Sequence, residues 1–173
     1  MAARVGLRHT QPMATPTEIS PLGKALGRLP TGLYIVTTLQ DGAPLGFVGS
    51  FVMQMGIAPP VVAVAVGKDR PHLAAMRASG RFGVSILAAG SNDLMGRFFR
   101  KYEAGKGPFD ELALERGAQG TPVLTDALAW LECRVTGEHA SGDHVVVFGE
   151  VVDGAQKRDG EPAIHLRKNG LGY

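Results

Sequence analysis

Cysteine, aromatic residues and long apolar runs are all scarce in this chain of 173 residues. Its single cysteine, Cys133, excludes an intrachain disulfide bond and any Cys-x-x-Cys metal or redox motif, and it fits a reducing compartment. Cys133 lies in an apolar run, so we interpret it as a small buried hydrophobic residue. The longest apolar run, residues 57–66, contains two prolines and is shorter than the ~20 residues that a transmembrane helix needs. We therefore expect a cytoplasmic protein with no membrane-spanning segment and no membrane partner.

A strong net charge is also absent, because the chain has 18 basic and 16 acidic residues and a formal net charge of +2. The basic side chains are scattered and lack interleaved aromatic residues, so no nucleic-acid partner is expected. The five histidines never fall at a metal-ligand spacing such as His-x-x-x-His, and we expect no metal site. Neither a Walker A nor a Gly-x-Gly-x-x-Gly motif is present, which disfavours a Rossmann-type nucleotide site.

The length fits one domain with a core of its own. We expect residues 1–19 to form a disordered N-terminal tail and residues 20–173 to form the domain. The tail contains basic residues and no acidic residue before Glu18, but it lacks the apolar core of a secretory signal. A transit peptide is the alternative interpretation of the tail.

Apolar runs bounded by Gly, Pro and Asp predict mainly strands. The strands are expected at residues 33–39, 45–55, 61–66, 82–87, 128–138, 144–152 and 163–167. Helical spacing of apolar residues predicts helices that begin at Ser20 and Ser91, and a third helix over residues 70–79. Residues 101–122 are rich in glycine and without periodicity, which is typical of a lid or binding loop. Because most strands follow one another as hairpins, a barrel is the expected architecture.

The stretch from Gly46 to Leu87 organises the chemistry of the chain. In it, the apolar strand at residues 61–66 is followed by a helix start that carries several basic residues. Asp69 is the expected N-cap, and Pro71 suits the first helical turn, so the helix N-terminus could hold a phosphate. The side chains that would add donors there are Lys68, Arg70 and His72. From the residues alone, solvated charges at an ordinary strand-to-helix corner are the favoured interpretation.

Several blocks of sequence, in a fixed order, carry a resemblance to a known family. The blocks are GLYIVTT at 32–38, GFVGSF at 46–51, the Pro-Pro strand ending in Lys-Asp-Arg at 68–70, RFGVSIL at 81–87, DALAWLECRV at 126–135 and SGDHVVVFGEV at 141–151. Over about residues 26–173 the chain resembles the flavin reductase-like family. It is similar in particular to the flavin reductase domain of cyanobacterial-type flavodiiron proteins, whose closing pattern His-x-Arg-Lys-x-Gly-x-x-Tyr matches residues 165–173.

The resemblance implies a mainly β fold with flanking helices, namely a six-stranded antiparallel split β-barrel of Greek-key-like order. It also implies a homodimer with FMN bound at the seam. The implied function is an NAD(P)H:flavin oxidoreductase that transfers hydride from NADH or NADPH to FMN and delivers reduced flavin or electrons to an acceptor such as a monooxygenase. FAD or riboflavin are alternative flavins. A non-enzymatic FMN-binding electron carrier of flavoredoxin type is the alternative function, and a pyridoxamine-phosphate-oxidase-like enzyme is a third.

No catalytic side chain is expected, because the cofactors perform hydride transfer themselves. The resemblance implies that the flavin ring lies along residues 47–51, its phosphate against residues 68–72, and that residues 85–87 line the same cleft. The expected flavin-binding residues are Phe47, Val48, Gly49, Ser50, Phe51, Lys68, Asp69, Arg70, His72, Ser85, Ile86 and Leu87. The chain departs from the common family pattern in two places. Gly49 stands where the family has Asn before Ser-Phe, and Pro71 and His72 stand where the family has hydroxyl donors.

His144 matches the family position that faces the nicotinamide side of the flavin. From the residues alone, Asp143-His144 is typical of a turn followed by a surface histidine. In relatives the loop around Phe109 lies near the flavin, so Phe109 could cover the ring. Arg167 and Tyr173 are weaker candidates for the same cleft.

Overall fold

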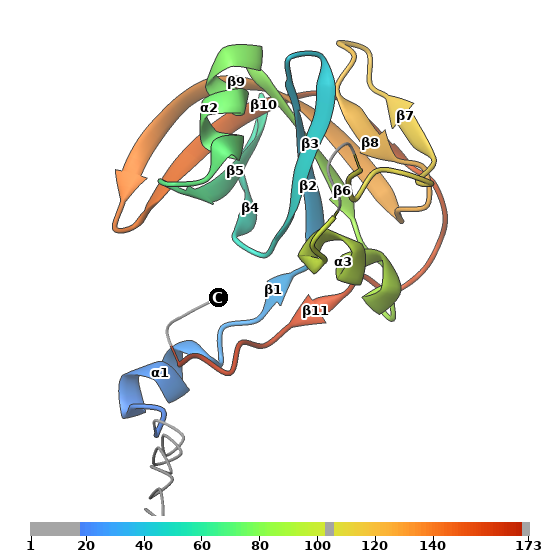
Figure 1. Ribbon diagram of the computed structural model, residues 1–173. Helices are drawn as coiled ribbons and strands as arrows, with labels where there is room; N and C mark the ends of the chain where they lie inside the picture. Colours follow the sequence, from blue (N-terminus) through green and yellow to red (C-terminus); the bar gives the residue numbers. More distant parts are fainter. Residues whose placement is uncertain (1–17, 103–105, 171–173) are drawn as a thin grey trace, which may run out of the picture. The chain divides into compact units, whose positions relative to one another are not determined.

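A computed structural model describes residues 18–102 and 106–170 of the protein (Figure 1). Residues 1–17 of the expected tail and Tyr173 lie outside the described residues. The described residues divide into two compact units, a main unit within residues 30–165 and a small unit formed by residues 18–29 and 166–170. Among the described residues, no helix is long and apolar enough to cross a bilayer.

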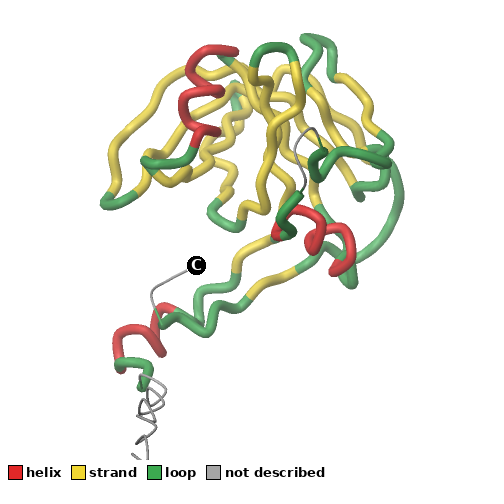
Figure 2. Tube along the Cα trace, in the orientation of Figure 1, coloured by secondary structure: helices red, strands yellow, loops and turns green. Residues whose placement is uncertain are grey.

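The main unit is built on one antiparallel sheet of seven strands (Figure 2). Their order across the sheet is β3-β2-β6-β9-β10-β5-β4. The strands are β2 (Tyr34–Gln40), β3 (Ala43–Gly49), β4 (Val52–Ile57), β5 (Pro60–Gly67), β6 (Arg81–Ile86), β9 (Ala129–Ser141) and β10 (His144–Gln156). The mainly β fold is confirmed, but the sheet is not closed, and the six-stranded barrel is not confirmed.

The predicted strand over residues 45–55 is wrong, because the structure has two strands there, β3 and β4, at opposite edges of the sheet. The chain changes ladders at Ser50 and Phe51, where the main-chain N–H of Ala65 donates to the Phe51 carbonyl over 2.9 Å. A Cβ on Gly49 would lie 2.8 Å from Val36 Cγ2, so only glycine fits this crossing. Since only two residues separate the edge strands, the sheet must curl strongly (Figure 1).

The long hairpin β9-β10 is confirmed, and it carries one wall of the candidate site. Its tight turn contains Gly142 with a φ of +57°, in the left-handed region that favours glycine. Strand β10 also pairs with β5, in a register that places His144 opposite Gly67. The main-chain N–H of Lys68 then donates to the Asp143 carbonyl over 3.0 Å. The hairpin turn is therefore fixed beside the start of the next helix.

Helix α2 (Pro71–Ser79) follows β5 and packs on β2 and β6. Pro71 takes the first helical position, as expected, and Gly80 closes the helix with a φ of +66°. The predicted N-cap is wrong, because Arg70 occupies that position in an extended conformation and makes no side-chain cap. Helix α3 (Asn92–Phe99) begins after Ser91, whose side chain makes no cap bond either.

Short elements complete the two units. In the small unit, helix α1 begins at an N-cap whose hydroxyl, Ser20 Oγ, accepts from the main-chain N–H of Gly23 over 3.1 Å. The remaining elements are α1 (Pro21–Leu26), β1 (Thr31–Gly32), which pairs with β11 (Ile164–His165), and β7 (Leu114–Arg116), which pairs with β8 (Pro122–Leu124). The predicted loop over 101–122 therefore contains a strand. Its tip is fixed by the buried Glu132 carboxylate, which accepts from the main-chain N–H groups of Gln119 and Thr121 over 2.8 Å each.

The main hydrophobic core lies on the inner face of the curled sheet. Its members include Val36, Val64, Val84 and Val147, which are almost fully buried. Cys133 belongs to this core and is fully buried, which confirms its interpretation as a small hydrophobic residue. Burial raises the pKa of its thiol to about 12, so Cys133 carries no thiolate at neutral pH.

Candidate functional site

A pocket of about 620 Å³ lies on the outer face of strands β4, β5 and β10 in the main unit. Its volume falls within the ~300–1,000 Å³ of pockets that hold small molecules and cofactors. The lining residues are mostly apolar, and they come from the five strands β1, β4, β5, β9 and β10 and from the segments that precede β1 and β4. They are Pro30, Thr31, Gly32, Ser50, Phe51, Val52, Met53, Met55, Ala63, Ala65, His139, Ser141, Val146 and Phe148.

The floor of this pocket is made by small side chains. Ala63 and Ala65 alternate along β5 with core valines, so their methyl groups point to the outer face. On the neighbouring strand β10, Phe148 lies opposite Ala63 and Val146 lies opposite Ala65. Two methyl groups framed by larger side chains leave a shallow hollow, against which a flat ring system could pack.

Sequence reasoning predicted Ser50 and Phe51, which line the pocket, but it missed the floor and the apolar rim formed by Met53 and Met55. The signal that could have found the rim is an alternation from Phe51 into β4, where Met53 and Met55 occupy every second position. These side chains are 40 %, 62 % and 52 % exposed, which is unusual for a group of large apolar residues. Large apolar side chains exposed together on the outer face of a strand indicate a ligand or partner on that face.

Three blocks that are distant in sequence meet beside this pocket. Phe51, which lines the pocket, packs edge-on against the His144 ring with ring centroids 5.7 Å apart. The Phe51 carbonyl is bound by β5, and the main chain of Lys68 is bound by the hairpin turn at Asp143. The structure thus brings together the predicted ring segment, the predicted phosphate corner and the predicted nicotinamide residue.

His144 is oriented by its neighbour in the turn. Its Nδ1 atom lies 2.6 Å from Asp143 Oδ1, and the His144 side chain is 14 % exposed while that of Asp143 is 91 % exposed. This hydrogen bond lowers the pKa of the Asp143 carboxyl below its ordinary value. A proton held on Nδ1 by Asp143 leaves Nε2 as the other functional atom of the ring.

The corner between β5 and α2 is suited to an anion. Helix α2 has no acidic residue in its first turn and no side-chain cap, so its N-terminal N–H groups and dipole are not neutralised from within the helix. Lys68, Asp69 and Arg70 are exposed at this corner. The two basic side chains favour a phosphate, while the Asp69 carboxylate opposes it.

His72 does not lie on the exposed corner, although the sequence grouped it with Lys68 and Arg70. It is only 8 % exposed, and its Nε2 atom lies 3.1 Å from the carbonyl oxygen of Gly46. Its ring packs edge-on against Phe47 at 4.8 Å between centroids. Burial lowers the pKa of His72. The neutral imidazole therefore donates to Gly46 and joins α2 to β3.

This burial predicts a pH dependence of stability. Unfolded His72 takes up a proton near its ordinary pKa of 6.5, whereas the folded protein holds it neutral to lower pH. The stabilisation that comes from neutral, buried His72 is fully present above pH 6.5. It is lost as the pH falls through the folded pKa, and the free energy of unfolding then falls by at most about 1.4 kcal/mol per pH unit. Urea unfolding between pH 7 and pH 5 measures this slope, and the His72→Gln variant should lose it. An unchanged slope in that variant would assign the pH dependence to another group.

The other expected residues lie behind the pocket and do not line it. Phe47 packs against the main core, and Val48 packs against a second core cluster that contains Leu87. Ser85 is fully buried, and its Oγ accepts from the main-chain N–H of Leu124 over 3.0 Å. Phe109, expected over the flavin ring, packs edge-on against Phe98 at 5.3 Å between ring centroids.

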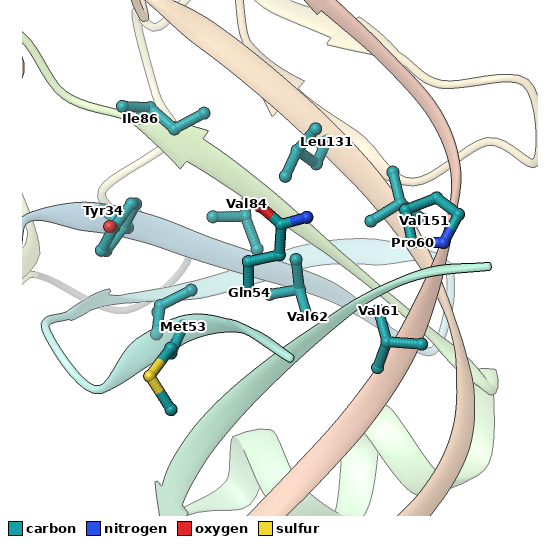
Figure 3. Close-up of a pocket in the computed structure, with 11 residues that line it drawn as sticks. Tyr34, Met53, Gln54, Pro60, Val61, Val62, Val84, Ile86, Leu131 and Val151 are labelled. Carbon is teal, nitrogen blue, oxygen red and sulfur yellow. The ribbon is translucent and has the colours of Figure 1, made fainter. Parts of the chain in front are cut away.

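Ile86 lines a different pocket, of about 300 Å³, on the inner side of the curled sheet. Figure 3 shows its side chain with those of Tyr34, Gln54, Val84 and Leu131 around this second pocket. Tyr34 and Gln54 provide polar atoms in an otherwise apolar lining, and burial raises the pKa of Tyr34. The two pockets share Val52 and Met53 of strand β4, which separates them.

Comparison with known proteins identifies the family. The model of the flavin reductase like domain matches residues 26–170. The chain therefore belongs to the flavin reductase-like family, and the resemblance found in the sequence is confirmed. Diflavin flavoprotein A 1 of Synechocystis sp. is 37 % identical over 156 residues, which cover 89 % of this chain and 27 % of that protein. The chain thus spans about a quarter of the length of the curated relatives it matches.

Solved structures agree with this assignment. Nitrilotriacetate monooxygenase component B from Mycobacterium thermoresistibile is 29 % identical with a TM-score of 0.77, over 86 % of this chain and 82 % of that chain. The NADH:FAD oxidoreductase SgcE6 from Streptomyces globisporus C-1027 is 28 % identical with a TM-score of 0.76, over 88 % of this chain and 95 % of that chain.

Proposed function

We propose that this chain is an NAD(P)H:flavin oxidoreductase that binds FMN in the outer pocket. The observation that carries the proposal is the meeting of the pocket, the anion corner at α2 and the His144 ring at Phe51. One solved relative is named an NADH:FAD oxidoreductase, which supports a flavin and a nicotinamide nucleotide as the two ligands.

The pocket fits a flavin in shape and in chemistry. The Ala63 and Ala65 methyl groups would lie against the flat ring system, and Phe148 would border it. Ser50, which lines the pocket and is 8 % exposed, would supply a hydroxyl to the polar atoms of the ring. The phosphate would bind at the corner formed by Lys68, Arg70 and the start of α2.

When bound, the flavin supplies the redox chemistry, by accepting hydride from a nicotinamide nucleotide and passing the electrons on. The residues of the chain bind and orient the two ligands. Asp143 holds the His144 ring in one orientation against Phe51, and His144 would contact the nicotinamide nucleotide. Preorganised donors near the pocket, such as the Ser50 hydroxyl, would stabilise negative charge on the reduced ring.

We further propose that the protein acts in the cytoplasm as a homodimer. Ile57 is 87 % exposed at the end of β4 and continues the apolar rim formed by Met53 and Met55. A second copy would cover this rim and close the split-barrel pocket from outside. An oxygenase is a fitting acceptor of the reduced flavin, since one solved relative is a component of nitrilotriacetate monooxygenase.

Substitution of Arg70 tests the phosphate corner. Arg70→Gln should weaken FMN binding about tenfold, because one charge-assisted contact to the phosphate is lost. Riboflavin, which has no phosphate, is the matched ligand, and its affinity should change less than about twofold. Fluorescence quenching of both flavins measures the two constants. If the affinities for FMN and riboflavin fall equally, the phosphate does not bind at this corner.

Two measurements separate a reductase from a flavoredoxin-type electron carrier. A reductase that supplies free flavin releases it, so purified protein should lose flavin on dialysis and turn over added FMN with NADH or NADPH. A carrier would retain FMN through dialysis and show no turnover with either nucleotide. The second result would reject the enzymatic proposal while leaving the flavin site intact.

A further inference from the structure

The small unit contains a concentration of positive charge that the proposed flavin chemistry does not use. A pocket of about 230 Å³ lies between α1 and the segment after β11. Its lining residues are Lys24, Gly27, Arg28, Leu166, Arg167 and Lys168. Four of these six residues are cationic and none is acidic.

The pocket exists because two glycines let the backbones approach. Gly23 and Gly27 are buried, one helical turn apart. A Cβ on Gly23 would collide with the carbonyl oxygen of Asn169, and a Cβ on Gly27 would lie 2.6 Å from that of Arg167. This close packing places Lys24 and Arg28 of the N-terminal segment beside Arg167 and Lys168 of the C-terminal segment.

This arrangement brings like charges close together. Lys24 and Arg28 are four residues apart, and like charges at this spacing repel one another on a helical turn. The C-terminal dipole of α1 offsets part of the charge, and Glu18 pairs with Lys24 at 3.7 Å. That pair is exposed on both sides, at 62 % and 92 %, so it contributes little. An anion in the pocket would offset the repulsion between Lys24 and Arg28.

We propose that this pocket, defined by Lys24, Arg28, Arg167 and Lys168, binds a diphosphate group. Lys24, Arg28 and Lys168 place three positive charges at one small pocket, which favours a ligand of more than one negative charge over a single carboxylate. Guanidinium groups bind phosphate oxygens in pairs, and two of the four cations are arginines. A volume below ~300 Å³ suits the charged group of a ligand more than a whole nucleotide. The site does not depend on the proposed flavin reductase activity.

Calorimetric titration of the full-length, flavin-free chain with inorganic pyrophosphate tests the site, with Arg70→Gln present in every variant so that the phosphate corner proposed at α2 is weakened throughout. Arg28→Gln should weaken pyrophosphate binding about tenfold, and Arg28→Gln with Lys168→Gln should abolish it. Arg100→Gln removes the same charge from an exposed position of the main unit and should leave the affinity unchanged. A loss in Arg100→Gln equal to that in Arg28→Gln would overturn the proposal.

Gly27→Ala tests whether pyrophosphate binding needs the shape of the pocket or only its positive charge. Its φ of −64° accepts alanine without backbone strain, and all four cations remain. The added methyl group must push the Arg167 backbone away from α1, so pyrophosphate affinity should fall about tenfold. Circular dichroism and thermal unfolding check that the main unit stays folded. Unaltered affinity in Gly27→Ala would refute the pocket. ADP, titrated in parallel, distinguishes a nucleotide from free pyrophosphate as the source of the group.

Discussion

Ala65→Trp is expected to weaken FMN binding roughly 100-fold while leaving the fold intact. Ala65 forms the floor of the outer pocket, and its methyl group points away from the core. An indole at this position would occupy the space where the flavin ring is proposed to lie. Loss of ring packing worth about 3 kcal/mol corresponds to roughly 100-fold weaker binding. Titration of flavin fluorescence measures the constant.

Ala140→Trp is the matched control for this substitution. Ala140 lies on β9 between His139 and Ser141, which both line the pocket, so alternation along the strand turns its side chain to the other face. It is exposed, and a tryptophan there should change FMN affinity less than about twofold. If Ala65→Trp binds FMN as tightly as Ala140→Trp does, the outer pocket is not the flavin site.

The second large effect is expected at His144. His144→Ala should lower kcat/KM for NADH or NADPH about 10- to 100-fold, because the ring that Asp143 and Phe51 hold in place would no longer position the nucleotide. FMN affinity should change less than about threefold, since the ring does not line the pocket. Steady-state rates at saturating FMN, together with flavin titration, measure both quantities.

Asp143→Asn provides a graded version of this test. The amide keeps the shape of the side chain but removes the negative charge that faces His144 Nδ1. Its kcat/KM should lie between those of the wild-type protein and His144→Ala, and the pH profile should change. If His144→Ala weakens FMN binding as much as it lowers kcat/KM, His144 supports the flavin and not the nucleotide.

Local patterns in the sequence predicted the β9-β10 hairpin and Pro71 in the first turn of α2, although the expected N-cap at Asp69 was wrong. The β9-β10 hairpin has apolar runs on both sides of a Gly-Asp turn, and Gly80 ends α2 in the left-handed conformation. Such signals depend on a few neighbouring residues, so they can be read without knowledge of the fold. The family resemblance, which rests on blocks in order, was equally accessible and is confirmed.

Features set by tertiary structure could not be predicted in this way. At Ser50 and Phe51 the chain stops pairing with β2 and begins to pair with β5. The apolar pattern of the sequence does not change at these residues, so it gives no sign that one strand ends and another begins. His72 has the sequence context of an exposed helix start, yet α2 packs that turn onto β3. Ser85 of β6 is buried because β8 lies over it, and the main-chain N–H of Leu124 in β8 donates to its hydroxyl.

The candidate site shows the same division. The polar residues at the site, His144 and the corner at Lys68 and Arg70, stand in recognisable motifs, and the structure brings them near Phe51. The apolar floor at Ala63 and Ala65 has no motif, since small residues in a buried strand are common. Only the pairing of β5 with β4 and β10 turns them into a pocket.

Anaerobic reduction of FMN by nicotinamide nucleotides tests the central proposal most directly. Purified protein is mixed with excess FMN, NADH or NADPH is added separately, and the visible flavin absorption is followed. We expect one of the two nucleotides to bleach many equivalents of FMN rapidly, which also identifies the preferred reductant. If FMN binds but neither nucleotide reduces it, the protein is not an NAD(P)H-dependent flavin reductase, and the electron-carrier alternative replaces it.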